Sequence, residues 1–529
     1  MDPIAGIAWI VSFVIVTVAV TGLSRKIGWS APVALVGVGA LVSFIPGIPA
    51  IEIEPDLVLY GLLPPLLFAA AIRTSLIDVR ARGDSILLLS VGLVAFTVVV
   101  VGLTTWWVVP AITLAAAFAF GAVVAPTDAV AVTAIAGRVG LPRRAVTVLE
   151  GESLLNDATA LVALNASIAA VVSVVTPLEI ATDFVVAVIG GVAVGLAVGF
   201  ALAAVRKYVH APVLDTSLSL ITPFVAFLLA EKIHGSGVLA VVVAGLYLGY
   251  RSPAIQSAEA RIAESVNWKT IQFLLENAVF LFIGLNLAGI LDGAVKSGPG
   301  LWQTVFISVA IFLALGFARF AWIAVATIVY RNGPARLRER GWTWSTSIVV
   351  AFAGIRGVVT LAAVFLLPEE IPNREFLQFL AFVIVVGSLV AGLALPWIIR
   401  RLALPSPDFD QEGIETQRLM AEAQTAGVLR LEEELVETDE ERVVERLRTN
   451  ARFLADALDR PAADGSEPLP ATYRRLRRLM LAAERDAVLT ARSERRYQEH
   501  AVRAALASID AEETALKASA PKKPGSELT

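Results

Sequence analysis

Long apolar runs separated by short polar stretches dominate the chain between residues 4 and 401. Each run is about 20 residues long, which as a helix is enough to cross a hydrocarbon core of about 30 Å. The first run starts at Ile4 with no basic stretch before it, which favours a membrane helix over a cleaved signal peptide. We predict thirteen spans, the second and ninth short, near residues 4–23, 31–45, 57–72, 86–108, 111–135, 148–175, 184–205, 217–231, 237–250, 271–290, 303–330, 344–366 and 377–399.

Lysine and arginine are distributed unevenly over the loops between these spans. With the N-terminus outside, the inner loops carry nineteen of them and the outer loops three. Cytoplasmic loops of membrane proteins are enriched in these residues. The distribution therefore predicts an all-α multi-pass protein of the plasma membrane, with the lipid bilayer as its surroundings, its N-terminus outside and its C-terminus in the cytoplasm.

The composition changes after Arg401. Residues 402–529 hold 19 Lys/Arg and 25 Asp/Glu, a net charge of −6. Segments 411–460 and 471–517 have the pattern of long amphipathic helices and flank a Pro/Gly-rich break at 461–470. We therefore expect a membrane domain over 1–401 and a cytoplasmic acidic helical tail over 402–529. The tail is either a solvated hairpin that supports dimerisation or a regulatory module that touches the basic inner loops or an unknown regulator.

The composition also excludes several kinds of chemistry. The chain is 57% hydrophobic and 17% charged, and it has no cysteine and three histidines. Disulfides, iron–sulfur sites and thiol nucleophiles are excluded, and neither a phosphate-binding G-x-x-x-x-G-K-[ST] loop nor an H-E-x-x-H motif occurs. We expect no enzyme, no cofactor and no nucleic-acid partner.

A few ionisable residues lie inside the predicted spans, where charge is costly and therefore points to function. They are Asp128, Glu152, Asp157, Glu276, Arg319 and Arg356.

The densest group opens the sixth span, with the sequence E-G-E-S-L-L-N-D at 150–157. Helical spacing stacks Glu152 over Asn156 and Ser153 over Asp157 on one face. Carboxylate, amide and hydroxyl oxygens of this kind suit hard cations. The alternative is an ordinary polar helix start near the inner interface.

The fifth span contains A-P-T-D at 125–128. Pro126 removes a backbone donor and disturbs the helix, which a membrane protein tolerates where the backbone is buried in protein or lines a cavity. Thr127, Asp128 and the freed carbonyls are then expected to meet Asp157. A kink that serves packing alone is the alternative.

The twelfth span contains A-G-I-R-G at 353–357. Arginine does not deprotonate in proteins, so Arg356 needs a counter-ion, and we expect Glu152 with Asn156 as an added acceptor. Similarly, Glu276 and Arg319 are expected to form a structural ion pair, with ion conduction as the alternative role.

The two interrupted spans occupy matching places. If spans one to six and eight to thirteen form two halves of opposite orientation, each interrupted span is the fifth of its half. Paired interruptions in inverted halves indicate the central binding site of a transporter.

Together these motifs resemble the monovalent cation/proton antiporters of the NhaP and eukaryotic sodium/proton exchanger type, over about residues 4–401. The resemblance is carried by E-S-L-L-N-D at 152–157, P-T-D-A-V-A-V at 126–132 and G-I-R-G at 354–357. It implies an NhaA-like homodimer in which a six-helix core with two broken crossing helices moves against a dimer domain.

The resemblance also implies residue roles. Asp157 would carry a cation and a proton in turn, and the other ligands or near ligands of Na⁺ would be Thr127, Asp128, Ser153 and Glu152. Asn156, Glu152 and Arg356 would form a supporting network. Because Asn156 cannot titrate, a single carrier implies electroneutral 1:1 exchange of Na⁺ for H⁺, unless Asp128 also titrates. Transport of K⁺, Li⁺ or mixed cations is the first alternative, and a tail-gated cation channel is the second.

Overall fold

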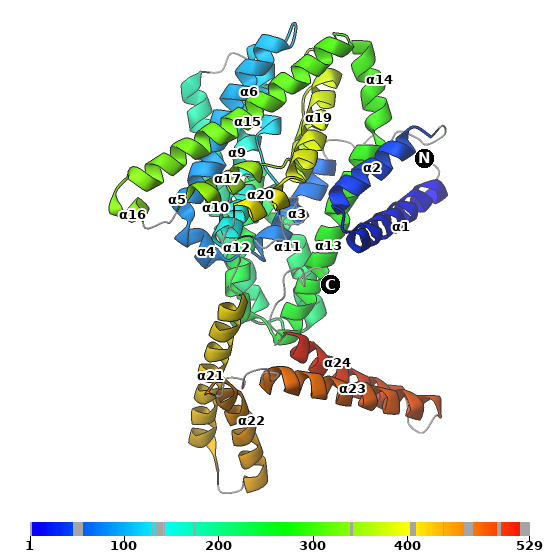
Figure 1. Cartoon of the computed structure of the whole chain (residues 1–529), viewed down its shortest axis with the longest axis vertical. Helices are drawn as coiled ribbons and strands as arrows, with labels where there is room; N and C mark the ends of the chain where they lie inside the picture. Colours follow the sequence, from blue (N-terminus) through cyan, green and yellow to red (C-terminus); the bar gives the residue numbers. More distant parts are fainter. Residues whose placement is uncertain are drawn as a thin grey trace. The chain divides into compact units, whose positions relative to one another are not determined.

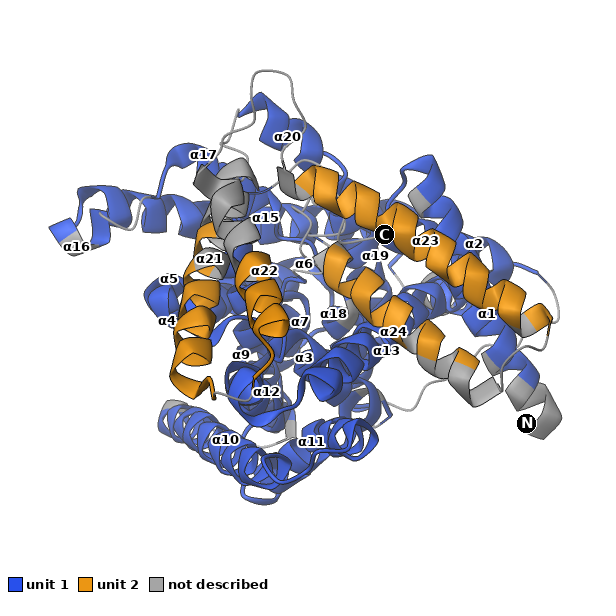
Figure 2. Cartoon of the chain, turned by 90° about the horizontal axis from the view of Figure 1, so that it is seen from below, with its two compact units in different colours: residues 1–404 blue, residues 405–529 orange. Residues whose placement is uncertain are grey.

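In the part of the chain that the computed structural model describes, all regular secondary structure is helical. These residues are 3–45, 57–128, 132, 141, 143–172, 176–297, 299–338, 342–402, 409–436, 439–459, 469–494 and 499–518. Residues 129–131 and 133–135 of the predicted fifth span and most of the predicted 461–470 break lie outside them. The chain forms two compact units, residues 1–404 and 405–529 (Figure 2).

The first unit contains the apolar helices. In chain order they are α1 (Pro3–Ile27), α2 (Ala31–Ser43), η1 (Leu57–Leu62), α3 (Leu63–Ala71), α4 (Leu76–Ala81), α5 (Gly83–Leu87), η2 (Leu88–Leu93), α6 (Val94–Val108), α7 (Leu114–Val124), α9 (Arg143–Val172), α10 (Pro177–Arg206), α11 (Pro212–Lys232), α12 (Gly237–Ile255), α13 (Ala258–Leu285), α14 (Leu287–Ser297), α15 (Leu301–Asn332), α16 (Ala335–Arg338), α17 (Trp344–Phe352), α18 (Val358–Phe365), α19 (Arg374–Gly392) and α20 (Leu395–Arg401).

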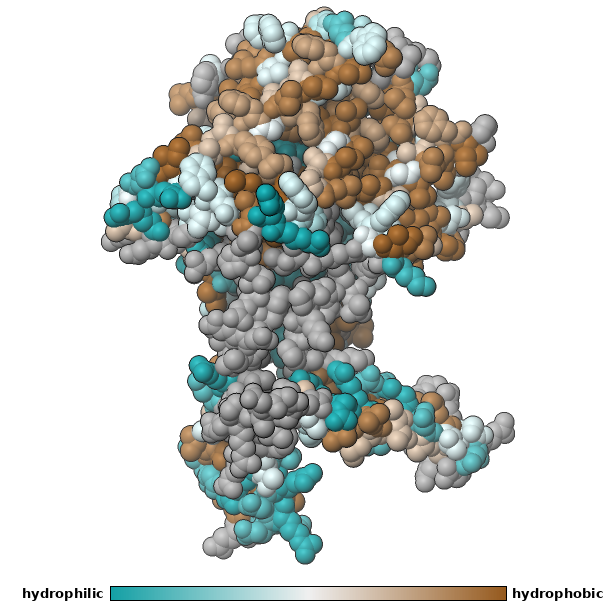
Figure 3. Space-filling view, in the orientation of Figure 1, coloured by the Kyte–Doolittle hydropathy of each residue, from teal (hydrophilic) through white to brown (hydrophobic). Residues whose placement is uncertain are grey.

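Many of these helices are suited to a hydrocarbon environment. Among the described residues, eight are long and apolar enough to cross a membrane, and four shorter apolar helices accompany them. Large apolar side chains such as Phe200, Phe306 and Phe317 are exposed on the surface of this unit. Figure 3 shows that hydrophobic residues, coloured brown, cover much of the visible face of this unit. Each predicted span coincides with a helix or a broken helix, although the number of membrane crossings remains a prediction.

The contacts between the helices of the first unit, which Figure 1 labels, define two groups. In one, which we call the scaffold group, α12 packs against α3, α10 and α11, and α13 packs against α2, α3 and α11. In the other, the core group, α7 packs against α6, α9 and α18, and α15 packs against α6, α17 and α19. The groups meet where α13 contacts α18 and where α9 contacts α3 and α12.

Two helices of the core group are broken, as the sequence predicts. Helix α7 ends at Val124 and is followed by a non-helical stretch up to Asp128. Helix α17 ends at Phe352, and α18 starts only at Val358. The two interruptions touch, because the backbone N–H of Asp128 donates to the carbonyl of Ile355 at 2.8 Å. Backbone groups that lose their helical partners thus find partners in each other, as a buried environment requires.

The second unit consists of two pairs of helices. Helix α21 (Phe409–Glu434) packs against α22 (Glu441–Asp459), and α23 (Leu469–Ser493) packs against α24 (Glu499–Ala518). The prediction of one long helix in each amphipathic segment was therefore wrong. The 411–460 segment is interrupted where Asp439 accepts a hydrogen bond from the N–H of Val436 at 3.0 Å, since a short acidic side chain competes with the helix for backbone donors.

Candidate ion-binding site

Helix α9 carries the densest polar group of the first unit. Glu152, Asn156 and Asp157 expose 1%, 1% and 4% of their surface, and Ser153 is half-buried. The helical spacing brings these four side chains to one side of α9, as the sequence predicts. Such burial is costly for charged and amide groups, so their partners define what the site can do.

Thr127, in the break after α7, connects the two elements. Its hydroxyl donates to Glu152 Oε1 at 3.0 Å. Asn156 Nδ2 donates to the hydroxyl oxygen of Thr127 at 3.0 Å and to its carbonyl at 3.2 Å. The structure thus brings Thr127, Glu152 and Asn156 into one hydrogen-bonded group, which fixes the break against α9.

The ionic partner of Glu152 is Arg319 of α15. Arg319 Nη1 lies 2.6 Å from Glu152 Oε1, and Nη2 lies 3.2 Å from Oε2, in a two-pronged contact between side chains that are both almost fully buried. The predicted structural ion pair between Glu276 and Arg319 is therefore wrong, and so is the expectation that Arg356 is the direct partner of Glu152. Sequence spacing within one helix does not tell which of two buried arginines on other helices reaches a given carboxylate.

Arg356 instead bonds to backbone groups. Its Nε donates to the carbonyl of Val124 at 3.2 Å, and its Nη1 donates to the carbonyl of Gly354. Its own backbone N–H donates to Ser388 Oγ on α19 at 2.9 Å. Val124 is the last residue of α7, so Arg356 satisfies a carbonyl that the helix break leaves without an intrahelical partner.

Arg319 serves the other broken helix in the same way. Its Nη2 donates to the carbonyl of Val350 at 2.9 Å, and its Nε lies 3.2 Å from the carbonyls of both Val350 and Ala351. These carbonyls belong to the last turn of α17. Each half-helix therefore ends on a guanidinium group, which satisfies the carbonyls and complements the negative end of the helix dipole.

Asp128 lies at the crossing of the two interruptions. A Cβ atom built on Gly357 would collide with its carboxylate, and one built on Gly354 would lie 2.6 Å from Arg319 Nε. Only glycine leaves room for both side chains. Thr127, the chain neighbour of Asp128, is bonded to Asn156, the chain neighbour of Asp157. The two aspartates that the sequence singled out thus lie in one site.

Glu276 lies on α13, on the scaffold side. Its Oε1 accepts a hydrogen bond from Gln272 Nε2 at 2.7 Å, and Gln272 Oε1 accepts one from Arg73 Nη1 at 3.0 Å. Glu276 therefore belongs to a chain of polar side chains that the sequence analysis did not foresee.

A second buried ionic group was also missed. Arg206, fully buried at the end of α10, donates to both carboxylate oxygens of Asp215 at 2.7 and 2.6 Å and to Glu264 at 2.7 Å. Gln256 donates to both acids, and Ser219 donates to Glu264. The group ties together the ends of α10 to α13 within the scaffold group. The sequence signal for this group was Asp215, which follows Arg206 after a short loop. It was not used because an arginine next to a loop is usually solvated.

The comparison with known proteins identifies this arrangement. The sequence model of the sodium/hydrogen exchanger transmembrane family matches residues 12–401, about three quarters of the chain. This range includes every element of the site. The chain belongs to the sodium/hydrogen exchanger family.

Relatives and solved structures agree with this assignment. An uncharacterised Na⁺/H⁺ exchanger of Mycobacterium tuberculosis is 32% identical over 97% of this chain and 96% of its own length. A sodium, potassium, lithium and rubidium/H⁺ antiporter of Bacillus pumilus is 33% identical over 69% of this chain and 57% of its own. The sodium/proton antiporter MjNhaP1 of Methanocaldococcus jannaschii is 18% identical and superimposes with a TM-score of 0.62 over 77% of this chain and 99% of its own. The exchanger is thus a multi-pass membrane protein with the NhaP fold, and its relatives are transporters.

Proposed function

We propose that this exchanger is a Na⁺/H⁺ antiporter of the plasma membrane in which Asp157 holds a cation and a proton in turn. One observation carries the proposal: Asp157 is buried on α9, and its neighbour Asn156 is bonded to Thr127 in the break that also holds Asp128. A buried carboxylate without a neutralising partner is unstable in a membrane interior. Proton and cation are the two species that neutralise it, and they compete for the same oxygens.

The remaining ligands are the oxygens around Asp157. We assign Asp128, Thr127 and Ser153 as ligands and Glu152 as a near ligand. Thr127 receives one hydrogen bond from Asn156 and donates its proton to Glu152, which leaves an oxygen lone pair for a cation. Among the described residues, the buried Asn156 Oδ1 has no hydrogen-bond partner. Oxygen atoms without a hydrogen-bond partner favour binding of an alkali cation over a purely structural role for this polar group.

Coupling follows from the cost of moving charge. When Asp157 holds a proton or a cation, the site can cross the membrane barrier, whereas the bare anion pays a larger dehydration penalty. The movement proposed is a rocking of the core group against the scaffold group, by alternating access. The arginine ends of α7 and α17 keep the two breaks attached to the core during this movement.

The number of side chains in the site that can bind and release a proton supports electroneutral exchange of one cation for one proton. Asn156 precedes Asp157 and does not titrate, and Glu152 is occupied as the ion partner of Arg319. With Asp128 acting as a ligand that does not titrate in the cycle, Asp157 is then the single carrier. Exchange of K⁺, Li⁺ or several cations is the second candidate, since the similar antiporter of Bacillus pumilus is described as acting on sodium, potassium, lithium and rubidium.

The remaining assignments concern the oligomeric state, the membrane and the orientation of the chain in it. We propose a homodimer in the plasma membrane with the N-terminus outside and the tail, 402–529, in the cytoplasm, on the basis of the uneven distribution of loop charges. The tail would support dimerisation or bind the basic inner loops. The first unit, 1–404, contains the proposed transport machinery.

The experiment is exchange in proteoliposomes that contain a pH-sensitive dye. Na⁺, K⁺ or Li⁺ is added to wild type, Asp157→Asn and the control Asp183→Asn, whose side chain is exposed on α10. We expect a cation-driven pH change in wild type and control, none in Asp157→Asn, and no effect of clamping the membrane potential. Full activity of Asp157→Asn, or cation entry without proton movement, contradicts the proposal, and the latter favours a channel.

A further inference from the structure

Three polar side chains of the scaffold group form a hydrogen-bonded chain. Arg73, just after α3, donates to Gln272, and Gln272 donates to Glu276. Gln272 and Glu276 are four residues apart on α13 and therefore lie on one face of the helix. Because the Gln272 amide is bonded at both ends, it holds the Glu276 carboxylate in a defined orientation.

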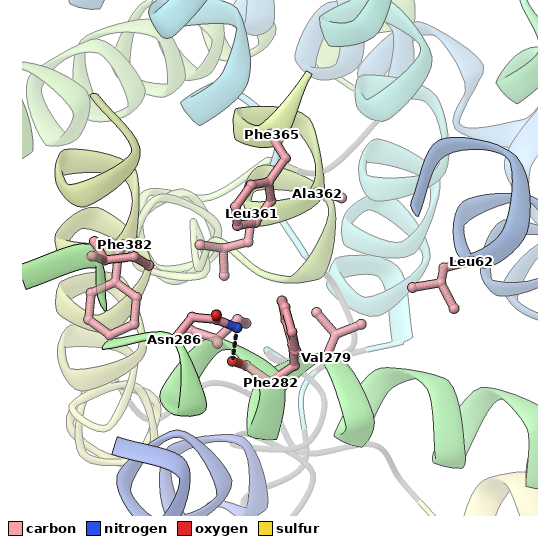
Figure 4. Close-up of a pocket in the computed structure, with 10 residues that line it drawn as sticks. Leu62, Val279, Phe282, Asn286, Leu361, Ala362, Phe365 and Phe382 are labelled. Carbon is pink, nitrogen blue, oxygen red and sulfur yellow. Dashed lines mark hydrogen bonds between the residues drawn. The ribbon is translucent and has the colours of Figure 1, made fainter. Parts of the chain in front are cut away.

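The face of α13 that carries Glu276 is the face that meets the core group. Val279 and Ile283 line a small apolar cavity of about 30 Å³ together with Leu361 of α18. Figure 4 shows the stick side chains of α13 and α18 on opposite sides of it. Glu276 lies three residues before Val279 and seven before Ile283, so it lies on the same face, one turn away from the cavity.

Asp128 approaches the same boundary from the other side. Gly357, which contacts the Asp128 carboxylate, lies one turn before Leu361. The carboxylates of Glu276 and Asp128 thus approach this boundary from its two sides. One belongs to the core group and the other to the scaffold group, and the cavity one turn away is lined almost entirely by apolar side chains.

We propose that Glu276 is a scaffold-side ligand of the transported cation, which passes between Glu276 and Asp128 on its way to Asp157. A monovalent cation between two facing carboxylates relieves their repulsion and regains oxygen ligands as it loses water. Gln272 and Arg73 are positioning residues that orient Glu276. This proposal rests on the proposed function, because it presupposes that a cation travels to Asp157.

The test measures cation-dependent exchange by the full-length protein in proteoliposomes, with Na⁺ and Li⁺ as probes. The variants are Glu276→Gln, Glu276→Asp and Gln272→Leu, compared with wild type, Asp157→Asn and the control Glu259→Gln, an exposed glutamate on the same helix. We expect Glu276→Gln to raise the KM for both cations by about tenfold or more while the maximal rate falls less. Glu276→Asp should recover part of the affinity, and Gln272→Leu should raise KM by a smaller factor.

Failure of this proposal is separable from failure of the proposed function. If wild type exchanges cations for protons and Asp157→Asn does not, but Glu276→Gln keeps the wild-type KM, Glu276 is not a ligand. A lower maximal rate and lower stability at unchanged KM would likewise overturn it, because that is the signature of a structural role. Should Glu276→Gln not fold, the KM values of Glu276→Asp and Gln272→Leu decide in the same way.

Discussion

Glu152 of α9 and Arg319 of α15 form a buried ion pair in which Nη1 and Oε1 are 2.6 Å apart, and the same guanidinium group holds the last carbonyls of α17. One side chain therefore joins the helix that carries Asp157 to one of the two broken helices. Arg356 makes the matching contact at the end of α7. The ion site is built on two half-helices that each end on an arginine.

Breaking the Glu152–Arg319 pair is expected to destabilise the exchanger. Arg319→Gln or Glu152→Gln leaves one charge buried without its partner, which typically costs about 3–5 kcal/mol. The double variant should lose less stability than the sum of the single variants, yet remain inactive because the α17 carbonyls lose their donor. Thermal unfolding in detergent and proteoliposome exchange measure the two effects. Additive losses of stability would mean that the pair contributes no coupling.

Gly357→Ala should impair cation binding. The added methyl group would occupy the position of the Asp128 carboxylate and displace it, and a shift of about 1 Å at a reacting group can cost on the order of 10²-fold. We expect the KM for Na⁺ to rise while the protein still folds. Gly316→Ala is the control, since a Cβ at that position has no neighbour within 4 Å. Equal KM values for the two variants would contradict the placement of Asp128.

Arg206→Met should lower stability without a change in cation affinity. The substitution removes the cation that holds Asp215 and Glu264 together and leaves two buried carboxylates facing each other, and loss of one partner from such a group costs about 3–5 kcal/mol. Because the group lies within the scaffold, the variant protein that remains folded should exchange with the wild-type KM. Lys207→Met, next to Arg206 and exposed, is the control. A raised KM at unchanged stability would show that the group belongs to the ion path.

The α23–α24 pair of the tail should loosen in acid. Arg477 binds both oxygens of Glu512 at 2.6 Å, and this contact lowers the pKa of Glu512 below its usual 4.5. A lowered folded-state pKa means that the stabilisation is present above about pH 4.5 and is lost as the pH falls through the lower value. Hydrogen exchange of the full chain, with wild type and Glu512→Gln compared, measures it. We expect faster exchange of α23 and α24 in the variant at pH 7, and no difference in strong acid.

Much of the site could be predicted from local patterns. The acids, the amide and the hydroxyl of residues 152–157 are presented together by the helical repeat alone, and Pro126 and the two glycines around Arg356 predicted both helix breaks. The pairing of charges was predicted wrongly. Glu152 has Arg319 and not Arg356 as its ionic partner, and the ionic group around Arg206 was not recognised.

The sequence by itself determined the apolar spans, the acidic tail and the short set of polar residues inside the membrane domain, because composition and helical periodicity are local properties of the chain. Only the tertiary structure decided that Asp128 bonds to the backbone of Ile355, that each half-helix ends on an arginine, and that Glu276 faces the core from α13. These contacts join residues from about 30 to more than 200 positions apart. They depend on which helices pack together, and helical periodicity fixes the face of a residue but not the helix that this face meets.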